Sequence, residues 1–300
     1  MIELLKNTDI DFIGFRKKAF LISALLVLLG IVSFVMLLSG KGNISVDFTG
    51  GTNIQVEFQR QIDIANVRKV LVEGGIGDVQ VQQIRGTNQF LVKTKASSTG
   101  EQKIENRIES ILKSGFPDNK PRVLSSTMVG PGVGKQLKNY AIIAVVLAFI
   151  GIIVYIAYRF TFLSGIAATI ATFHDVVAIM GVFWILNKEF NLLIITALLT
   201  IAGYSLQDTV VVFDRIRENM GKMKSKDDFG NVLNRSINEV LSRTIVTGIS
   251  TLLALGAIMI LGGEVLFDFS FALFIGLIVG TYSSIFVASP LLYMWRKRAL

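Results

Sequence analysis

The sequence predicts a polytopic α-helical membrane protein. We expect six transmembrane helices, arranged one plus five, with a small extracytoplasmic ferredoxin-like α+β domain between helices one and two. Of the 300 residues, 52% are hydrophobic and 17% are charged, and the mean hydropathy is +0.59, which excludes an ordinary soluble domain. A helix needs about 20 apolar residues to cross a bilayer. Six segments meet this requirement, at residues 19–39, 140–158, 162–186, 191–213, 244–262 and 267–295.

These segments divide the chain, because a long polar stretch separates the first from the other five. The expected parts are an N-terminal segment, the first helix, an outer domain, a five-helix transmembrane domain and a tail, at residues 1–18, 19–39, 43–130, 131–295 and 296–300.

The distribution of Lys and Arg sets the orientation, because these residues collect in cytoplasmic loops. With the N-terminus inside, fifteen of them fall in inner segments and only Lys188 falls in the two short outer loops. The fifteen are Lys6, Arg16, Lys17, Lys18, Arg159, Arg215, Arg217, Lys222, Lys224, Lys226, Arg235, Arg243, Arg296, Lys297 and Arg298. The sequence therefore predicts cytoplasmic termini and an outer domain on the opposite side. The net charge of +8 is first a topology signal and not the footprint of a nucleic-acid site.

The first helix is expected to stay as an uncleaved anchor. Arg16, Lys17 and Lys18 resemble the basic region of a signal peptide, but the apolar run is too long and no A-x-A cleavage site follows it. The chain contains no cysteine, which excludes disulfides and thiolate chemistry.

The outer domain alternates strand and helix patterns. Residues 44–58 have a hairpin pattern around Gly50-Gly51, and a second hairpin turns through residues 86–88. Amphipathic helices are predicted at 63–75 and 101–116, and a strand at 121–130. The order strand–helix–strand–strand–helix–strand is that of a ferredoxin-like fold. The glycine-rich string at 129–135 is expected to form a hinge before the second membrane helix.

The outer domain has no catalytic pattern. It contains no histidine, no phosphate-binding loop and no telling pair of acids. The glycines of residues 46–52 lie between strand patterns and not before a helix, which favours a turn. We therefore expect no enzyme activity, no metal and no cofactor.

Polar residues inside the membrane helices carry the functional prediction. Asp208 lies in an apolar run, where an ionisable group costs about 2.5–3.5 kcal/mol to insert and is a functional candidate by default. Gln207 precedes it, and Thr196, Thr200 and Tyr204 share its helix face. In the next helix, Arg243, Thr244, Thr247, Gly248 and Thr251 form a similar stripe. Since the two helices leave and re-enter the membrane on one side, Asp208 and Arg243 can approach each other.

Further candidates have competing interpretations. Asp208 could pair with Arg243 only to fix packing, and Arg243 could be an anchor that extends to the membrane surface. His174, the one histidine, and Asp175 could handle protons or form a structural pair. Gly276-x-x-x-Gly280, followed by Ser283 and Ser284, permits close helix contact. Residues 214–230 are expected to be solvated surface, and 231–242 an interfacial amphipathic turn.

The chain resembles the SecF branch of the SecD/SecF family, membrane subunits of the bacterial protein translocation machinery within the resistance–nodulation–division superfamily. The strings that carry the resemblance are VDFTGGT, VGPGVGKQL, FHDVVAIMGVF, IAGYSLQDTVVVFDRIREN and SRTIVTGISTLLAL. Family members usually have Asn-Asp where this chain has Gln207-Asp208.

The resemblance implies a mechanism and a set of partners. A SecD subunit would supply a matching six-helix half, and the pair would use the proton gradient to drive late steps of polypeptide translocation. Asp208 and Arg243, with Gln207 beside them, would form the proton relay, and the resemblance assigns no further residue. His174, Asp175, Thr209 and Thr247 are candidate supporting residues because they are polar groups inside the membrane helices. Implied partners are SecD, the SecYEG channel, YajC, the unfolded exported polypeptide and membrane lipid, in the bacterial inner (plasma) membrane. Protons are the expected coupling ion, and sodium stays open because the same oxygen atoms coordinate it.

Two other classes of function are compatible with the sequence. One is half of a proton-coupled small-molecule exporter of the same superfamily, although such pumps carry two large outer domains per chain. The other is a passive scaffold subunit of the translocon, which would have no need of Asp208.

Overall fold

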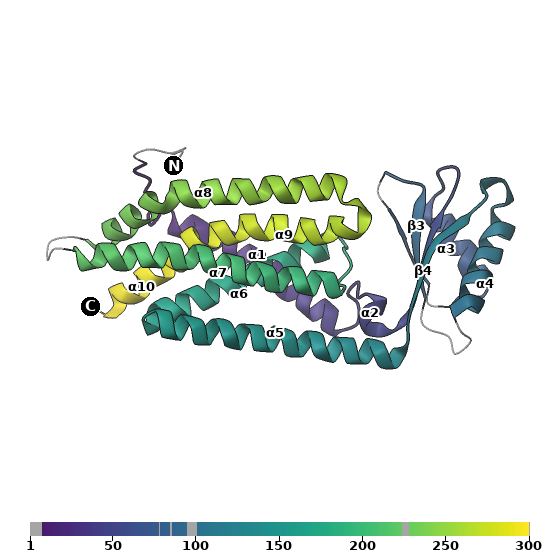
Figure 1. Cartoon of the computed structure of the whole chain (residues 1–300), viewed down its shortest axis with the longest axis horizontal. Coiled ribbons are helices and arrows are strands. Elements are labelled where there is room, and N and C mark those ends of the chain that lie inside the picture. The colour runs from purple at the N-terminus through teal and green to yellow at the C-terminus, as the bar shows by residue number, and fades with distance from the viewer. Residues whose placement is uncertain (1–7, 78, 85, 95–100, 224–227, 300) are drawn as a thin grey trace. The chain divides into compact units, whose positions relative to one another are not determined.

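Six apolar helices make up most of the chain in the computed structural model, which describes residues 8–77, 79–84, 86–94, 101–223 and 228–299 (Figure 1). Lys6, Lys224 and Lys226 lie outside these ranges. The described part divides into two compact units, residues 44–143 and residues 1–43 with 144–300, and the division falls within helix α5.

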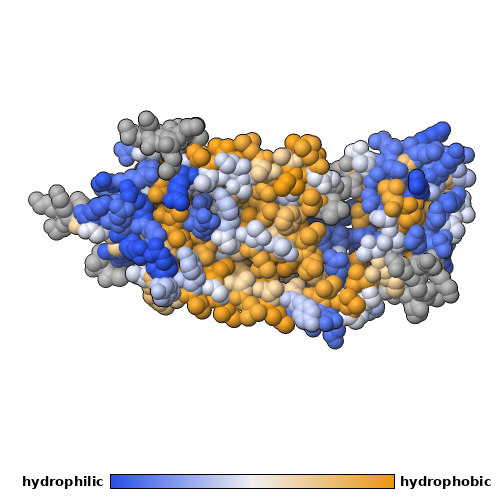
Figure 2. Space-filling model, in the orientation of Figure 1, coloured by the Kyte–Doolittle hydropathy of each residue, from blue (hydrophilic) through white to orange (hydrophobic). Residues whose placement is uncertain are grey.

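Each of the six spans is long and apolar enough to cross a membrane, which confirms the predicted fold class. The helices are α1 (Arg16–Leu38), α5 (Pro131–Arg159), α6 (Phe162–Ile185), α7 (Leu192–Gly221), α8 (Phe229–Leu261) and α9 (Gly263–Ser283). The last one continues through a π-helical turn, η2 (Ser284–Ala288), into α10 (Ser289–Ala299). Figure 2 shows hydrophobic side chains over the middle of the helical unit and hydrophilic ones at the end that carries the C-terminus.

The π-helical turn lies next to a proline. Pro290 has no N–H to donate, and its ring disturbs the preceding helical turn. Ser289 Oγ donates to the carbonyl oxygen of Ser284 at 3.1 Å, which satisfies one group of the widened turn. Such single π turns occur often at functional positions in helices.

Small residues bring the central helices close together. α6 packs against α1, α7 and α9 and, with α9, is among the most buried spans. A Cβ atom added at Gly30 of α1 would lie 2.1 Å from the carbonyl oxygen of Val177 in α6, and one at Gly276 of α9 would lie 2.6 Å from Ile201 of α7. The predicted close contact along the Gly276–Gly280 face is thus present.

The helices are longer than predicted at the end that carries the C-terminus. α7 runs on to Gly221, and α8 already begins at Phe229, so residues 231–242 continue the membrane helix and form no separate turn. Ion pairs stabilise this extension, because Arg215 bonds Glu218 and Glu239 at 2.6 Å and Arg159 bonds Asp214 at 2.6 Å.

The hinge predicted at 129–135 is also helical, because α5 already begins at Pro131. Proline is well suited to the first position of a helix.

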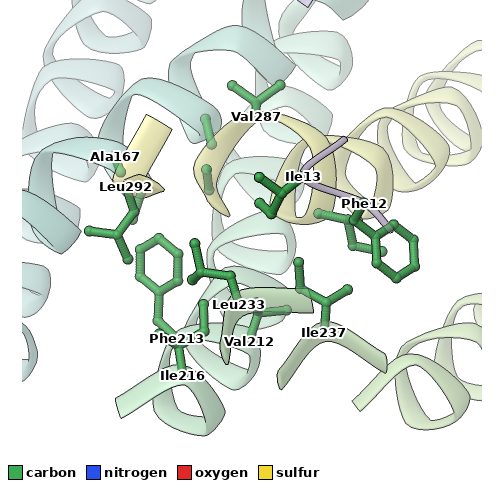
Figure 3. Packing of buried hydrophobic residues seen from close by; sticks show 14 of the residues in the cluster. Phe12, Ile13, Ala167, Val212, Phe213, Ile216, Leu233, Ile237, Val287 and Leu292 are labelled. Atoms are coloured by element: carbon green, nitrogen blue, oxygen red, sulfur yellow. The ribbon is translucent and has the colours of Figure 1, made fainter. Parts of the chain in front are cut away.

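A hydrophobic cluster anchors the segment before α1. Phe12 and Ile13 are buried against α7, α8 and η2 (Figure 3). Two side chains of α8 bind the backbone of this segment. Asn234 Oδ1 accepts from the Ile13 N–H at 2.9 Å, and Asn238 both accepts from and donates to the backbone of Ile10. We call residues 8–14 the N-terminal strap.

The smaller unit contains a four-stranded antiparallel sheet in the order β2-β3-β1-β4. The strands are β1 (Gly51–Glu57), β2 (Gln80–Gln83), β3 (Gln89–Thr94) and β4 (Arg122–Val129). Two amphipathic helices, α3 (Ile64–Glu73) and α4 (Glu101–Gly115), share one hydrophobic core with the strands, and η1 (Pro117–Asn119) is a short 3-10 turn before β4. The order along the chain, β1-α3-β2-β3-α4-β4, is the predicted ferredoxin-like arrangement.

The hairpin predicted at residues 44–58 is wrong. Residues Val46–Thr49 form a one-turn helix, α2, whose N-cap Ser45 accepts from the Asp47 N–H at 3.2 Å. Gly50 and Gly51 then have φ values of 71° and 140°, a region that residues with a Cβ atom rarely occupy. The glycine pair therefore turns the chain from helix to strand, and not from strand to strand.

Candidate functional site in the membrane helices

Asp208 lies on a cavity between α7 and α8. The cavity has a volume of about 50 Å³ and is lined by Tyr204, Gln207, Asp208, Val211, Arg243, Thr244 and Thr247. The α7 residues follow a spacing of three and four, which places them on one helix face. A water molecule needs about 10–15 Å³ of such space and two to four polar partners. The cavity is therefore large and polar enough to hold water beside the Asp208 carboxylate.

The carboxylate has a defined partner in a third helix. Thr281 Oγ1 of α9 donates to Asp208 Oδ2 at 3.3 Å. Tyr204, which also lines the cavity, links α7 to α8, because its OH group lies 3.5 Å from Thr251 Oγ1. Asp208 is thus held by α9 while it faces α8.

Arg243 lines the same cavity but makes no ion pair with Asp208 within 4.0 Å among the described residues. Arg243 is exposed and Asp208 is half-buried. Because Asp208 and Arg243 line one cavity without a direct ion pair, each can bond either water or the other residue. A closed salt bridge between them would instead hold both charges in place.

The polar lining of α8 contains one unused group. Thr247 Oγ1 is occupied by the backbone carbonyl groups of Arg243 and Thr244. Thr244 Oγ1 is buried and has no hydrogen-bond partner in the part of the chain that the structure describes. A buried hydroxyl without a partner is costly, so this one is suited to a water molecule in the cavity.

The structure brings together most but not all of the predicted site residues. Gln207, Asp208, Arg243 and Thr247 line the cavity, whereas Thr209 does not, because it bonds Ser284 of η2 at 3.0 Å on the neighbouring face of α7. His174 and Asp175 form a separate buried cluster on α6. Sequence reasoning missed Thr281, although the polar run Thr281–Ser284 inside an apolar helix was a signal for it.

Comparisons with known proteins give the family. Residues 108–298 match the family model described as protein export membrane protein SecD/SecF, C-terminal, and residues 45–62 match the SecD/SecF GG motif. The chain belongs to the SecD/SecF family. Within it the chain is SecF-type, since it is 48% identical to the protein translocase subunit SecF of Thermodesulfovibrio yellowstonii, over 100% of this chain and 99% of that protein. SecF of Endomicrobium trichonymphae is 40% identical over 97% of this chain and 93% of that protein.

Solved structures agree with this assignment. The crystal structure of SecDF from Thermus thermophilus, a translocon-associated membrane protein, matches with a TM-score of 0.85 and 36% identity over 97% of this chain. A SecDF structure in the super-membrane-facing form has a TM-score of 0.70 at 36% identity, over 98% of this chain. The chain spans 39% of the first SecDF chain and 40% of the second. The chain is accordingly a SecF-type, non-enzymatic membrane subunit of the protein translocase.

Proposed function

We propose that this subunit works with a SecD partner and uses the proton gradient to drive late steps of polypeptide translocation. Asp208 is the proton-accepting group, Arg243 is the cation that competes with the proton for it, and Gln207 shapes the mouth of the cavity. The observation that carries the proposal is the polar cavity that joins Asp208 to Arg243 inside two apolar helices. One proton that crosses the membrane potential releases about 2.3 kcal/mol per 100 mV, which is enough to bias a two-state motion.

A partner surface follows from the exposure of this site. Gln207, Arg243 and Thr247 are exposed on the outside of the bundle, yet they lie on helices apolar enough to span a membrane. Contact with lipid would be costly for the Arg243 side chain, so another polar surface must cover this strip. A SecD half fits this role, because the similar SecDF chains are more than twice as long as this chain. We further propose that the SecYEG channel, YajC and the exported polypeptide contact this assembly.

The proposed location is the bacterial inner membrane, with both termini in the cytoplasm and residues 43–130 outside. The basic extensions of α7 and α8 support this orientation through the positive-inside rule. Single cysteines can test it because the chain has none of its own. In intact cells, an impermeant thiol reagent should label a cysteine at exposed Asp118 of the outer domain and not one at Lys222, at the end of α7. Labelling of position 222 from outside would reverse the scheme.

The function is tested in vesicles that contain this chain, its SecD partner and the translocase, with pH and sodium gradients imposed separately. Asp208→Asn removes the titratable group and should abolish gradient-dependent translocation without loss of the assembled complex. Asp208→Glu keeps the acid and should retain part of the activity. Arg243→Met removes the competing cation and should cause a loss similar to that of Asp208→Asn. Asp118→Asn makes the same chemical change at an exposed position of the outer domain and is the matched control.

Two results would contradict the proposal. Normal gradient-dependent translocation by Asp208→Asn would leave the chain with a scaffold role. Translocation that follows the sodium gradient alone would keep the site but replace the proton as the coupling ion.

A further inference from the structure

A second carboxylate is buried in the helical unit, outside the Asp208 cavity. The side chain of Asp175 in α6 is 0% exposed and that of His174 is 4% exposed. His174 Nδ1 lies 2.9 Å from Asp175 Oδ1. Two hydroxyl groups from other helices contact Asp175 Oδ2, Ser205 Oγ of α7 and Ser283 Oγ of α9, the latter at 2.7 Å. Three helices therefore meet at one acid.

This cluster satisfies an ionised carboxylate. The Nδ1–H of His174 donates to Oδ1, while the hydroxyl groups of Ser205 and Ser283 donate to Oδ2. In this tautomer, Nε2 of the neutral imidazole carries only a lone pair. That agrees with the structure, because Nε2 is buried and has no partner among the described residues. A protonated imidazolium would instead bury an N–H without an acceptor, and an unpaired buried group costs more when it is charged.

The cluster satisfies a protonated carboxyl equally well. Ser283 Oγ also lies 3.1 Å from the carbonyl oxygen of Gly280, and its single proton can go to either acceptor. When Ser283 donates to Gly280, its oxygen is free to accept a proton carried by Asp175 Oδ2. Ser205 and His174 keep their bonds. The two states differ by one proton and by the rotation of one hydroxyl group, and neither leaves a polar atom of the carboxyl unpaired.

We propose that Asp175 is a second proton-binding site of this subunit, with Ser283 as the hydroxyl that exchanges roles and His174 as a fixed Nδ1–H donor. Binding of one proton from water changes the carboxyl from a charge of −1 to 0. No other charged group is bonded to the carboxyl in the described structure. Within two turns of the bonded residues, the titratable groups on these helices are His174 of α6, Tyr204 and Asp208 of α7, and Tyr282 of α9, which bonds Ser23 and Ala19 of α1. The other charged residues of α7 and α9 lie farther along these helices, at 214–218 and 264–268. The charges of α1 and α10 lie at the helix ends, at residues 16–18 and 296–298.

The position of the cluster suggests what the proton controls. Ser205 lies one turn before Asp208 on α7, and Ser283 lies two residues after Thr281, which bonds Asp208. A charge on Asp175 makes both hydroxyl groups donate toward α6, and protonation reverses the bond to Ser283, whose own proton then goes to the Gly280 carbonyl oxygen of α9. The proton on Asp175 therefore acts on the two helices that position Asp208. This consequence rests on the proposed function, whereas proton binding at Asp175 does not.

Infrared difference spectroscopy measures the proton directly. The full chain, purified with a histidine-free tag and placed in lipid bilayers, is titrated between about pH 5 and pH 9, which brackets the ordinary imidazole pKa of about 6.5. Acidification should produce bands of protonated carboxyl groups. The band of protonated Asp175 should vanish in Asp175→Asn and persist in Asp208→Asn. The band of protonated Asp208 should vanish in Asp208→Asn and persist in Asp175→Asn. Asparagine has the same shape, and its carbonyl oxygen accepts both serine bonds. Its NH2 group can donate to His174 Nδ1 once the imidazole carries its proton on Nε2, so Asp175→Asn should keep the packing with the other histidine tautomer. Identical carboxyl bands in the wild type and in Asp175→Asn would overturn the proposal.

Two further measurements keep the test decisive if Asp175→Asn does not assemble. Ser283→Ala removes the exchanging hydroxyl and should shift the frequency and the midpoint of the Asp175 component only. An unchanged band would count against the proposed exchange. His174 is the only histidine, so ¹⁵N-histidine labelling gives a single imidazole, whose ring should remain neutral with the proton on Nδ1. An imidazolium signal that appears with the band would assign the proton to His174 and overturn the proposal. Failure of Asp208→Asn to affect translocation would leave all of these outcomes unchanged.

Discussion

The contact between α1 and α6 gives the sharpest prediction for stability. Gly30 of α1 is buried, and the Cβ atom of Gly30→Ala would lie 2.1 Å from the carbonyl oxygen and 2.3 Å from Cγ1 of Val177. Optimal contacts between carbon atoms are about 3.5–4.0 Å, so the helices must separate by about 1 Å or more. A carbonyl oxygen in a helix cannot rotate away as a side chain can. Overpacking of this kind costs about 1–3 kcal/mol.

Gly203 of α7 is the matched control. It lies in a membrane helix, is exposed, and has no atom within 4 Å of an added Cβ. Alanine is a better helix former than glycine by about 0.8–1.0 kcal/mol, so Gly203→Ala should be neutral or stabilising. Thermal unfolding of the full chain in detergent should place Gly30→Ala roughly 2–12 °C below the wild type, from about 2–4 °C per kcal/mol. If Gly30→Ala melts at or above Gly203→Ala, the close approach of α1 and α6 is not present in the molecule.

Three other predictions concern the strap and the outer domain. Asn234→Ala removes the hydrogen bonds of Asn234 with the Ile13 N–H and with Asp11 Oδ1. The groups left unpaired should lower the free energy of unfolding of the strap by about 1–3 kcal/mol. Hydrogen exchange at the Ile13 amide should therefore become faster. Asp11 accepts hydrogen bonds from the Gly14 N–H and from the Asn234 side chain, and these bonds, the Gly14 bond most strongly, hold the pKa of Asp11 below its ordinary value of 3.8. The contribution of Asp11 is therefore complete above pH 3.8 and is lost as the pH falls through the lower folded value, and exchange at the Gly14 amide should accelerate there. Residues 43–130 expressed alone should fold, because they hold nearly the whole smaller compact unit and its hydrophobic core; a disordered circular dichroism spectrum or measurable nucleotide affinity would refute this.

The membrane helices could be predicted because length and apolar composition suffice for them. The ends of α7 and α8 could not. Residues 214–221 and 229–243 are rich in charges, and a polar run at a membrane boundary is equally compatible with a loop. Two ion pairs favour helix here. Arg215 pairs with Glu218 one turn along α7 and with Glu239 of α8, and the second pair depends on how two distant segments are placed.

The candidate site was predictable in part for a similar reason. The spacing of Tyr204, Gln207 and Asp208 fixes one helix face, and a shared membrane side brings Arg243 near it. The third helix of each polar cluster could not be derived in this way. Nothing in the spacing of Thr281 and Ser283 shows that one bonds Asp208 and the other bonds Asp175. The hairpin at 44–58 failed because strand alternation in residues 44–49 is too short to exclude a capped helical turn.

The buried cluster around Asp175 is hard to explain as packing alone. Apolar side chains of similar volume generally stabilise a protein interior as well as a buried charged group does, or better. The chain nevertheless places an acid, an imidazole and two hydroxyl groups where α6, α7 and α9 meet, next to glycines that bring these helices together. Close packing makes the site sensitive, because a change of one charge cannot be absorbed by loose surroundings. α7 carries Asp208 itself and also Ser205, which bonds Asp175. α9 carries Thr281, which bonds Asp208, and Ser283, which bonds Asp175. A proton gained at Asp175 therefore alters the two helices that hold Asp208, and not only the electrostatic field at Asp208.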